Sequence, residues 1–103
     1  MQPTPNRAAR LTATLTAAFT PLDLRVTDDS GQHVGHAGAT AAGETHYSVL
    51  LVSPLFDGMT RVARSRAVHA ALASEFGEPD QGGMHALALT LRAPAEHLAF
   101  QNR

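Results

Sequence analysis

The sequence contains no cysteine, no lysine and no tryptophan among its 103 residues. Without cysteine, the chain alone can form no disulfide, thiol nucleophile or thiolate metal cage. Without lysine, it has neither a phosphate-binding Gly-Lys-Ser/Thr loop nor a Schiff-base amine. Aromatic residues make up only 5%, which leaves little to line a substrate cleft. Gly-x-Ser-x-Gly, His-Glu-x-x-His and dinucleotide-binding motifs are also missing, so the sequence argues against an enzyme.

Charge and long apolar runs are equally scarce. The net charge is -1, so no broad basic field is available to grip a phosphate backbone. Apolar runs such as residues 49–52 reach only four residues, whereas a membrane-spanning helix needs roughly 20. Residues 1–5 do not open a basic and then apolar signal sequence. We therefore expect a cytoplasmic protein.

The length fits one small domain with a single core. We expect a flexible tail at residues 1–6, which hold two prolines and no pattern, and one domain at residues 7–101. From about Asn6, apolar residues at helical spacing predict a helix that Pro21 ends, because proline restricts the residue before it. The apolar stripe comprises Leu11, Leu15, Ala18 and Phe19.

Two strands and a long loop are predicted next. Leu22, Leu24 and Val26 alternate with polar residues, which predicts a half-buried strand that ends in a turn at residues 28–31. Residues 31–44 carry four glycines and no large hydrophobe, so we expect a long loop. Residues 45–53 predict a central strand, which Pro54 closes. If the two strands form a hairpin, the glycine-rich loop is its tip.

A helical stretch follows. Thr60 is placed to cap a helix that runs to Phe76, with Gly77 as its stop. Ser65 and the small residues near it would permit a break into a short and a long helix.

A strand and a short helix complete the pattern. Residues 84–91 predict a strand with leucine on one face and small residues on the other. Pro94 starts a last helix that runs through Phe100. This order of elements predicts an α/β (α+β) fold in which helices pack on one face of a three-stranded sheet.

Several separated motifs resemble the BolA family. The Phe-Asp-Gly-Met string at residues 56–59 is followed by Arg64-Ser65-Arg66 and later by Met84-His85-Ala86-Leu87. The string Glu44-Thr45-His46-Tyr47 is similar to the subgroup with histidine, and not cysteine, in the preceding loop. The family commonly has Arg-His-Arg where this chain has Arg64-Ser65-Arg66. The similarity covers about residues 7–98.

The resemblance implies both a fold and a function. The fold is a single-domain sandwich related to the type II KH fold, with topology αββααβα and a mixed three-stranded sheet. BolA proteins pair with monothiol glutaredoxins in heterodimers that share a [2Fe-2S] cluster, and they act in iron-sulfur cluster assembly, trafficking or iron regulation. Some members are DNA-binding transcriptional regulators in stress responses. We expect a monomer in isolation, because no residual apolar stripe demands a symmetric mate.

The resemblance also assigns cluster ligands. A chain without thiolates cannot hold an iron-sulfur cluster alone, but its six histidines can donate imidazole nitrogen. In the implied arrangement, a glutaredoxin cysteine and bound glutathione ligate one iron, and His85 with a loop histidine ligates the other. His33 aligns best with the loop ligand, and His36 is its substitute. Two histidines in place of two thiolates raise the reduction potential, as in Rieske centres.

Other interpretations of the histidines stay open. His85 could be a rim histidine satisfied by a backbone carbonyl, and zinc bound by His33, His36 and His85 is a minor alternative. We interpret His46 as a structural side chain hydrogen-bonded near the sheet edge. Two further histidines, His69 and His97, are expected to face solvent.

A nucleic-acid surface is the alternative function. Arg61, Arg64 and Arg66 lie around the predicted helical break, as on a helix-turn-helix surface. Three arginines on a nearly neutral domain predict weak, salt-sensitive binding of DNA, and a solvated or partner-contacting helix face explains them more simply.

Overall fold

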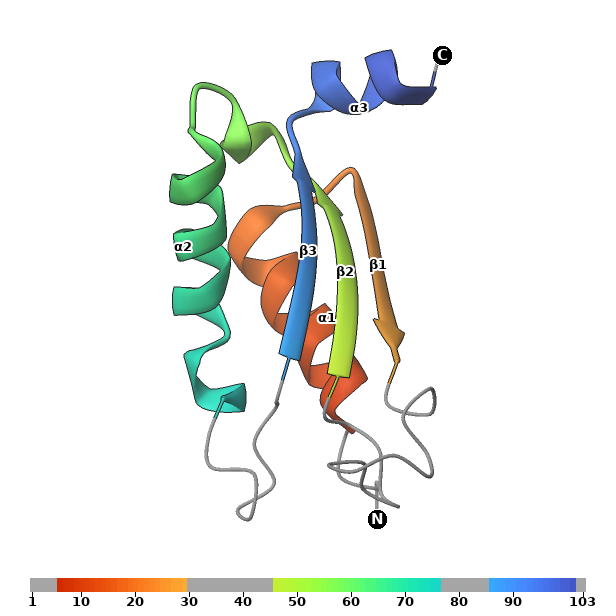
Figure 1. The fold of residues 1–103 in the computed structure, drawn as a ribbon, viewed down its shortest axis with the longest axis vertical. Helices are drawn as coiled ribbons and strands as arrows, with labels where there is room; N and C mark the ends of the chain where they lie inside the picture. Colours follow the sequence, from red (N-terminus) through yellow and green to blue (C-terminus); the bar gives the residue numbers. More distant parts are fainter. Residues whose placement is uncertain (1–5, 30–45, 77–85, 102–103) are drawn as a thin grey trace.

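The structure is a computed structural model that describes residues 6–29, 46–76 and 86–101 (Figure 1). Its elements are α1 (Arg7–Phe19), β1 (Asp23–Asp28), β2 (His46–Val52), η2 (Pro54–Phe56), α2 (Arg61–Ala71), η3 (Ala73–Glu75), β3 (Ala86–Arg92) and α3 (Pro94–Gln101). This order confirms the predicted αββααβα arrangement, with η2 and α2 as the helix pair. Within these segments, no helix has the length and apolar character needed to cross a membrane.

The three strands form one mixed sheet in the order β1-β2-β3. β1 and β2 pair antiparallel, with Asp23 opposite Val52, and β2 and β3 pair parallel, with His46 opposite Ala86. The predicted central strand and its pairing with β1 are therefore confirmed. The predicted loop at residues 31–44 falls outside the described residues.

The core lies between the sheet and two helices on one of its faces. Tyr47, Val49 and Leu51 of β2 alternate along the strand and are all buried. They form one cluster with residues of α1 and α2, so both helices cover the same face of the sheet. The helix residues in this cluster include Leu11, Leu15, Phe19 and Val68. On β3 the leucines at 87, 89 and 91 are half-buried while the small residues between them are exposed, as predicted.

The helix starts follow the capping residues seen in the sequence. The Asn6 side chain accepts a hydrogen bond from the Ala9 N–H (2.9 Å), and the Thr60 hydroxyl accepts one from the Ala63 N–H (3.1 Å). These side chains satisfy backbone donors that a helix leaves open in its first turn. After α1, Thr20 adopts a left-handed conformation (φ 42°) that ends the helix.

The helical stretch after β2 differs from the prediction. α2 is continuous through Ser65, and the break lies earlier, at the turn that contains Gly58 (φ 78°). α2 also ends at Ala71 and not at Phe76, because the chain leaves helical geometry at Leu72 and continues into η3. That turn brings Glu75 to the arginines of α1. The predicted stop at Gly77 falls outside the described residues.

Two apolar positions lie in a more exposed environment than the pattern predicts. Leu22 precedes β1 and is 69% exposed, because only its backbone N–H joins the sheet, at the Val52 carbonyl (2.8 Å). Ala18 is exposed at the margin of the α1 stripe. Apolar character alone therefore does not show whether the core reaches these two positions.

Candidate functional site

The predicted cluster ligands His33, His36 and His85 lie outside the described residues. The strand ends next to them in the chain are described. β1 ends at Asp28, opposite Tyr47, and His46 at the start of β2 lies opposite Ala86 at the start of β3. Segments 30–45 and 77–85 therefore both join the sheet at this end, which is the lower end in Figure 1.

His46 lies at the end of the central strand and not along an edge strand. His46 is half-buried, and its backbone carbonyl accepts a hydrogen bond from the Asp29 N–H (2.8 Å). The Ser48 hydroxyl donates to the Asp29 carboxylate. These contacts fix the end of the β1–β2 pair from which residues 30–45 depart. Among the described residues, no three His, Asp or Glu side chains gather as a metal site.

His69 and His97 have different surroundings. His69 is exposed on α2, as predicted, and its ring stacks on Phe76 with centroids 5.3 Å apart. The prediction for His97 is wrong, since its side chain is only 14% exposed. Its Nδ1 lies 3.2 Å from Arg92 Nη1, and its Nε2 lies 3.7 Å from an Asp23 carboxylate oxygen. His97 thus joins α3 to β3 and β1.

Arg64 is a buried structural residue. It is 6% exposed, and its Nε donates to the Met59 carbonyl at 3.0 Å. Its Nη1 and Nη2 donate to the two carboxylate oxygens of Glu96, at 2.6 and 3.3 Å. The guanidinium also lies 5.7 Å from the centroid of the Phe56 ring. Arg64 therefore ties α2 to α3 and to the loop before α2.

The sequence carried a signal for this burial. Val68 on α2 and Leu72 just after it are buried at a spacing of four residues, and residue 64 is the previous position of the same stripe. The other two predicted arginines, Arg61 and Arg66, are exposed. The structure therefore does not bring the three arginines together on one open surface.

Glu96 completes the contact between α2 and α3. Besides binding Arg64, its carboxylate accepts a hydrogen bond from the Ala93 N–H (2.7 Å), so it also caps the start of α3. The hydrogen bonds from Arg64 and then Ala93 hold the pKa of Glu96 below its usual value, and the charges of Arg64 and Arg61 act in the same direction. Glu96 stays ionised as a fixed partner for Arg64.

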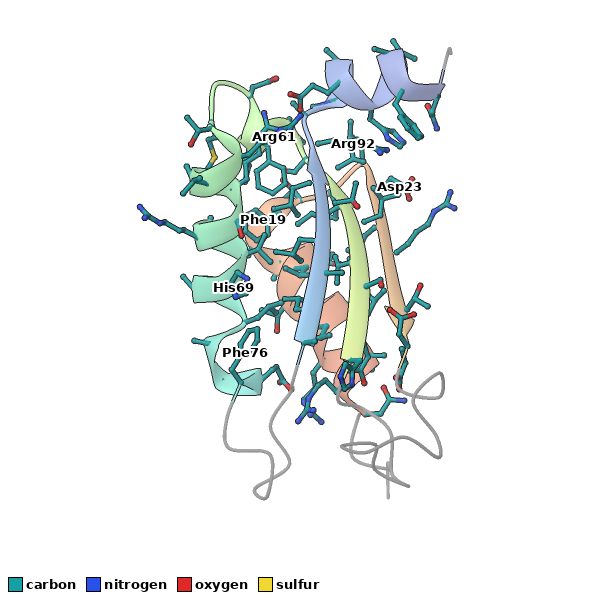
Figure 2. The ribbon with its side chains drawn as sticks, viewed as in Figure 1. Phe19, Asp23, Arg61, His69, Phe76 and Arg92 are labelled. Atoms are coloured by element: carbon teal, nitrogen blue, oxygen red, sulfur yellow. The ribbon has the colours of Figure 1, made fainter. Side chains whose placement is uncertain are left out.

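A groove of about 540 Å³ lies beside this contact, between α2, the end of β3 and α3. It is lined by Arg61, Arg64, Ser65, Leu89, Thr90, Leu91, Arg92, Glu96, Ala99 and Phe100. Figure 2 shows Arg61 and Arg92 near the upper end of the sheet, whereas Phe76 lies near the lower end. The groove is therefore remote from the strand ends at His46 and Ala86. Sequence reasoning missed it, because the α2 wall is far in the chain from the walls formed by β3 and α3.

Fold and connectivity define a small α+β protein with a mixed three-stranded sheet. The model of the family described as "BolA-like protein" matches residues 15–96, and the chain belongs to the BolA family.

Curated relatives agree with this assignment. The chain is 39% identical over 93 residues to "Protein BOLA1, chloroplastic" of Arabidopsis thaliana, covering 88% of this chain and 56% of that protein. It is 40% identical over 88 residues to human "BolA-like protein 1", covering 85% of this chain and 58% of that protein. The chain therefore spans less than two thirds of the length of these relatives.

A solved structure supports the fold directly. BolA1 from Arabidopsis thaliana aligns with a TM-score of 0.74 at 36% identity, over 91% of this chain and 98% of that one. The predicted BolA-like fold and family are therefore confirmed.

Proposed function

We propose that this protein is a non-enzymatic adaptor that pairs with a monothiol glutaredoxin and shares a [2Fe-2S] cluster with it. Membership of the BolA family is the observation that carries the proposal. His85 and a loop histidine, His33 or its substitute His36, would supply imidazole to one iron. The partner cysteine and glutathione would supply the sulfur ligands, because this chain has no cysteine.

The strand ends give the proposal structural support. His85 directly precedes Ala86, which lies opposite His46, and segment 30–45 joins the same end of the sheet. Two ligands far apart in the sequence can therefore serve one site without a change in the described fold. When bound, the [2Fe-2S] cluster would serve either in electron transfer or as a cluster for transfer to another protein. The protein's own part would be to supply neutral imidazoles from the segments that precede His46 and Ala86.

The test uses the intact chain mixed with a [2Fe-2S]-loaded monothiol glutaredoxin and glutathione. We expect a one-to-one complex with a changed visible circular dichroism spectrum, and loss of that change in His85→Ala. His69→Ala is the matched control, because His69 is exposed on α2. The change should disappear in either His33→Ala or His36→Ala, which identifies the loop ligand. An unchanged spectrum in His85→Ala would refute the ligand assignment.

DNA binding through Arg61, Arg64 and Arg66 remains a second candidate with less support. The Arg64 guanidinium is occupied by Glu96 and the Met59 carbonyl, so only two of the three arginines are exposed. If the heterodimer does not form, a salt titration of DNA binding with Arg61→Ala and Arg66→Ala is the next measurement. Loss of binding in both variants would support this function.

A further inference from the structure

The groove beside α3 runs along an edge of the sheet. In the described part of the chain, β3 pairs only with β2, so its other side is an edge. The Arg92 carbonyl accepts from the Ser53 N–H (3.0 Å) on the β2 side. Because backbone groups of successive strand residues alternate in direction, those of Leu89 and Leu91 face the outer side. Arg64 Nη1 donates to the Leu91 carbonyl at 3.4 Å from the side away from β2, in agreement with this outward direction.

This edge offers backbone hydrogen bonds to an added strand. Residues 89–92 all line the groove, and at about 3.3 Å per residue they span roughly 13 Å, enough for about four residues of an extended chain. No hydrogen bond from a described residue reaches Leu89 on its outer side. Sheet edges with open backbone groups bind extended peptides by strand addition.

The charges of the groove select the occupant. Three arginines line it, Arg61, Arg64 and Arg92, against one carboxylate, that of Glu96. Glu96 is bound to Arg64 by both oxygens, which leaves the exposed Arg61 and the half-buried Arg92 as the excess positive charge. Leu89 and Leu91 add apolar surface to the groove lining. An extended segment with alternating acidic and apolar side chains complements this lining.

We propose that the groove binds an extended acidic segment of a partner protein, which adds as a strand to the outer edge of β3. The backbone of the segment pairs at Leu89, and a carboxylate of the segment meets Arg61. Leu89, where the segment pairs, lies three residues along β3 from Ala86, or about 10 Å, and the groove extends from there toward Arg92, away from that end of the sheet. A partner could therefore occupy it while the sheet end at His46 and Ala86 stays accessible, so the inference does not depend on the proposed cluster role.

A protein segment fits the groove better than single-stranded nucleic acid. Nucleic acids without a partner strand bind by stacking bases on aromatic faces. Phe100 is the one aromatic residue among the described lining residues, and the Arg92 guanidinium lies over its ring at 3.9 Å. That face is covered, whereas no hydrogen bond from a described residue reaches the outer backbone edge at Leu89.

The probe is a short acetylated peptide in which glutamate and valine alternate, titrated into the folded chain and followed by fluorescence anisotropy. A lysine-valine peptide tests charge, and a glutamate-valine peptide methylated at alternate backbone nitrogens tests strand addition. We expect binding of the first peptide alone. Arg61→Glu should weaken it about tenfold, because an attraction becomes a repulsion. Arg66→Glu changes the net charge equally on an exposed part of α2 outside the groove lining, and should leave binding within about twofold.

Amide hydrogen exchange gives an independent readout. The peptide should slow exchange at the outward-facing amides of Leu89 and Leu91 and leave Ala88 and Thr90, which face β2, unchanged. Equal binding of the acidic and methylated peptides, or equal weakening by Arg61→Glu and Arg66→Glu, would overturn the proposal. Arg61-dependent binding of a single-stranded oligonucleotide without binding of the acidic peptide would also overturn it and assign the groove to nucleic acid.

Discussion

Replacement of Arg64 by alanine should destabilise the protein far more than replacement of Arg66, although both are arginines of α2. The Met59 carbonyl would lose a charged hydrogen bond from a buried donor, which is worth about 1.5–3 kcal/mol. Loss of the cation–π contact with the fully buried Phe56 removes about 0.5–1 kcal/mol more. The hydrogen bond from Arg64 to the Leu91 carbonyl is long and adds little to the free energy of unfolding. We therefore expect Arg64→Ala to lower the free energy of unfolding by about 3 kcal/mol.

The assay is urea unfolding followed by far-ultraviolet circular dichroism. A loss of that size should lower the urea midpoint by about 2 M, whereas the exposed Arg66→Ala should change the free energy of unfolding by less than about 0.5 kcal/mol. Arg64→Lys should fall between them, because an ammonium cannot bind Met59 and both Glu96 oxygens in the same geometry. If Arg64→Ala costs no more than Arg66→Ala, Arg64 is not a structural residue, and the DNA-binding interpretation regains its third arginine.

Two further predictions concern stability. Hydrogen bonds from Arg10 and then Arg7 hold the pKa of Glu75 below its usual value despite partial burial; their stabilisation is present above the unfolded pKa of about 4.3 and is lost as pH falls through the lower folded pKa. Urea midpoints measured down this acid range should therefore fall less steeply in Glu75→Gln, and parallel profiles would contradict the ion-pair argument. The fully buried Ser53 hydroxyl donates to the Phe19 carbonyl at 2.6 Å, so Ser53→Ala should cost about 1–3 kcal/mol, and a cost near zero by the same assay would show that water replaces the bond.

The sequence predicted what depends on nearby residues. The starts of α1 and α2 follow from Asn6 and Thr60, whose side chains cap backbone groups three positions away. The central strand follows from its uninterrupted apolar run, which is typical of a strand covered by its neighbours. The early end of α2 could not be predicted this way, because η3 positions Glu75 against arginines of α1 more than 60 positions earlier in the chain.

The candidate sites likewise include residues that local sequence indicates and residues that only the folded structure brings together. The family motifs indicated His85, His33 and His36 as ligands. No local sequence property distinguishes these histidines from His97, which the structure places between Asp23 and Arg92. The burial of His97 depends on contacts of α3 with β1 and β3, and its chain neighbours Glu96 and Leu98 give no indication of these contacts. The edge groove likewise exists only after α2, β3 and α3 have come together.

The parallel pairing of β2 with β3 has a consequence for the order of folding. The β1–β2 pair closes between Asp28 and Tyr47, whereas His46 must find Ala86, 40 positions further along the chain. Contacts between distant positions lose more chain entropy and form more slowly. The β1–β2 pair can thus form early, while β3 docks late beside β2. Because His85 directly precedes β3 in the chain, we expect the proposed cluster sharing to require the completely folded protein.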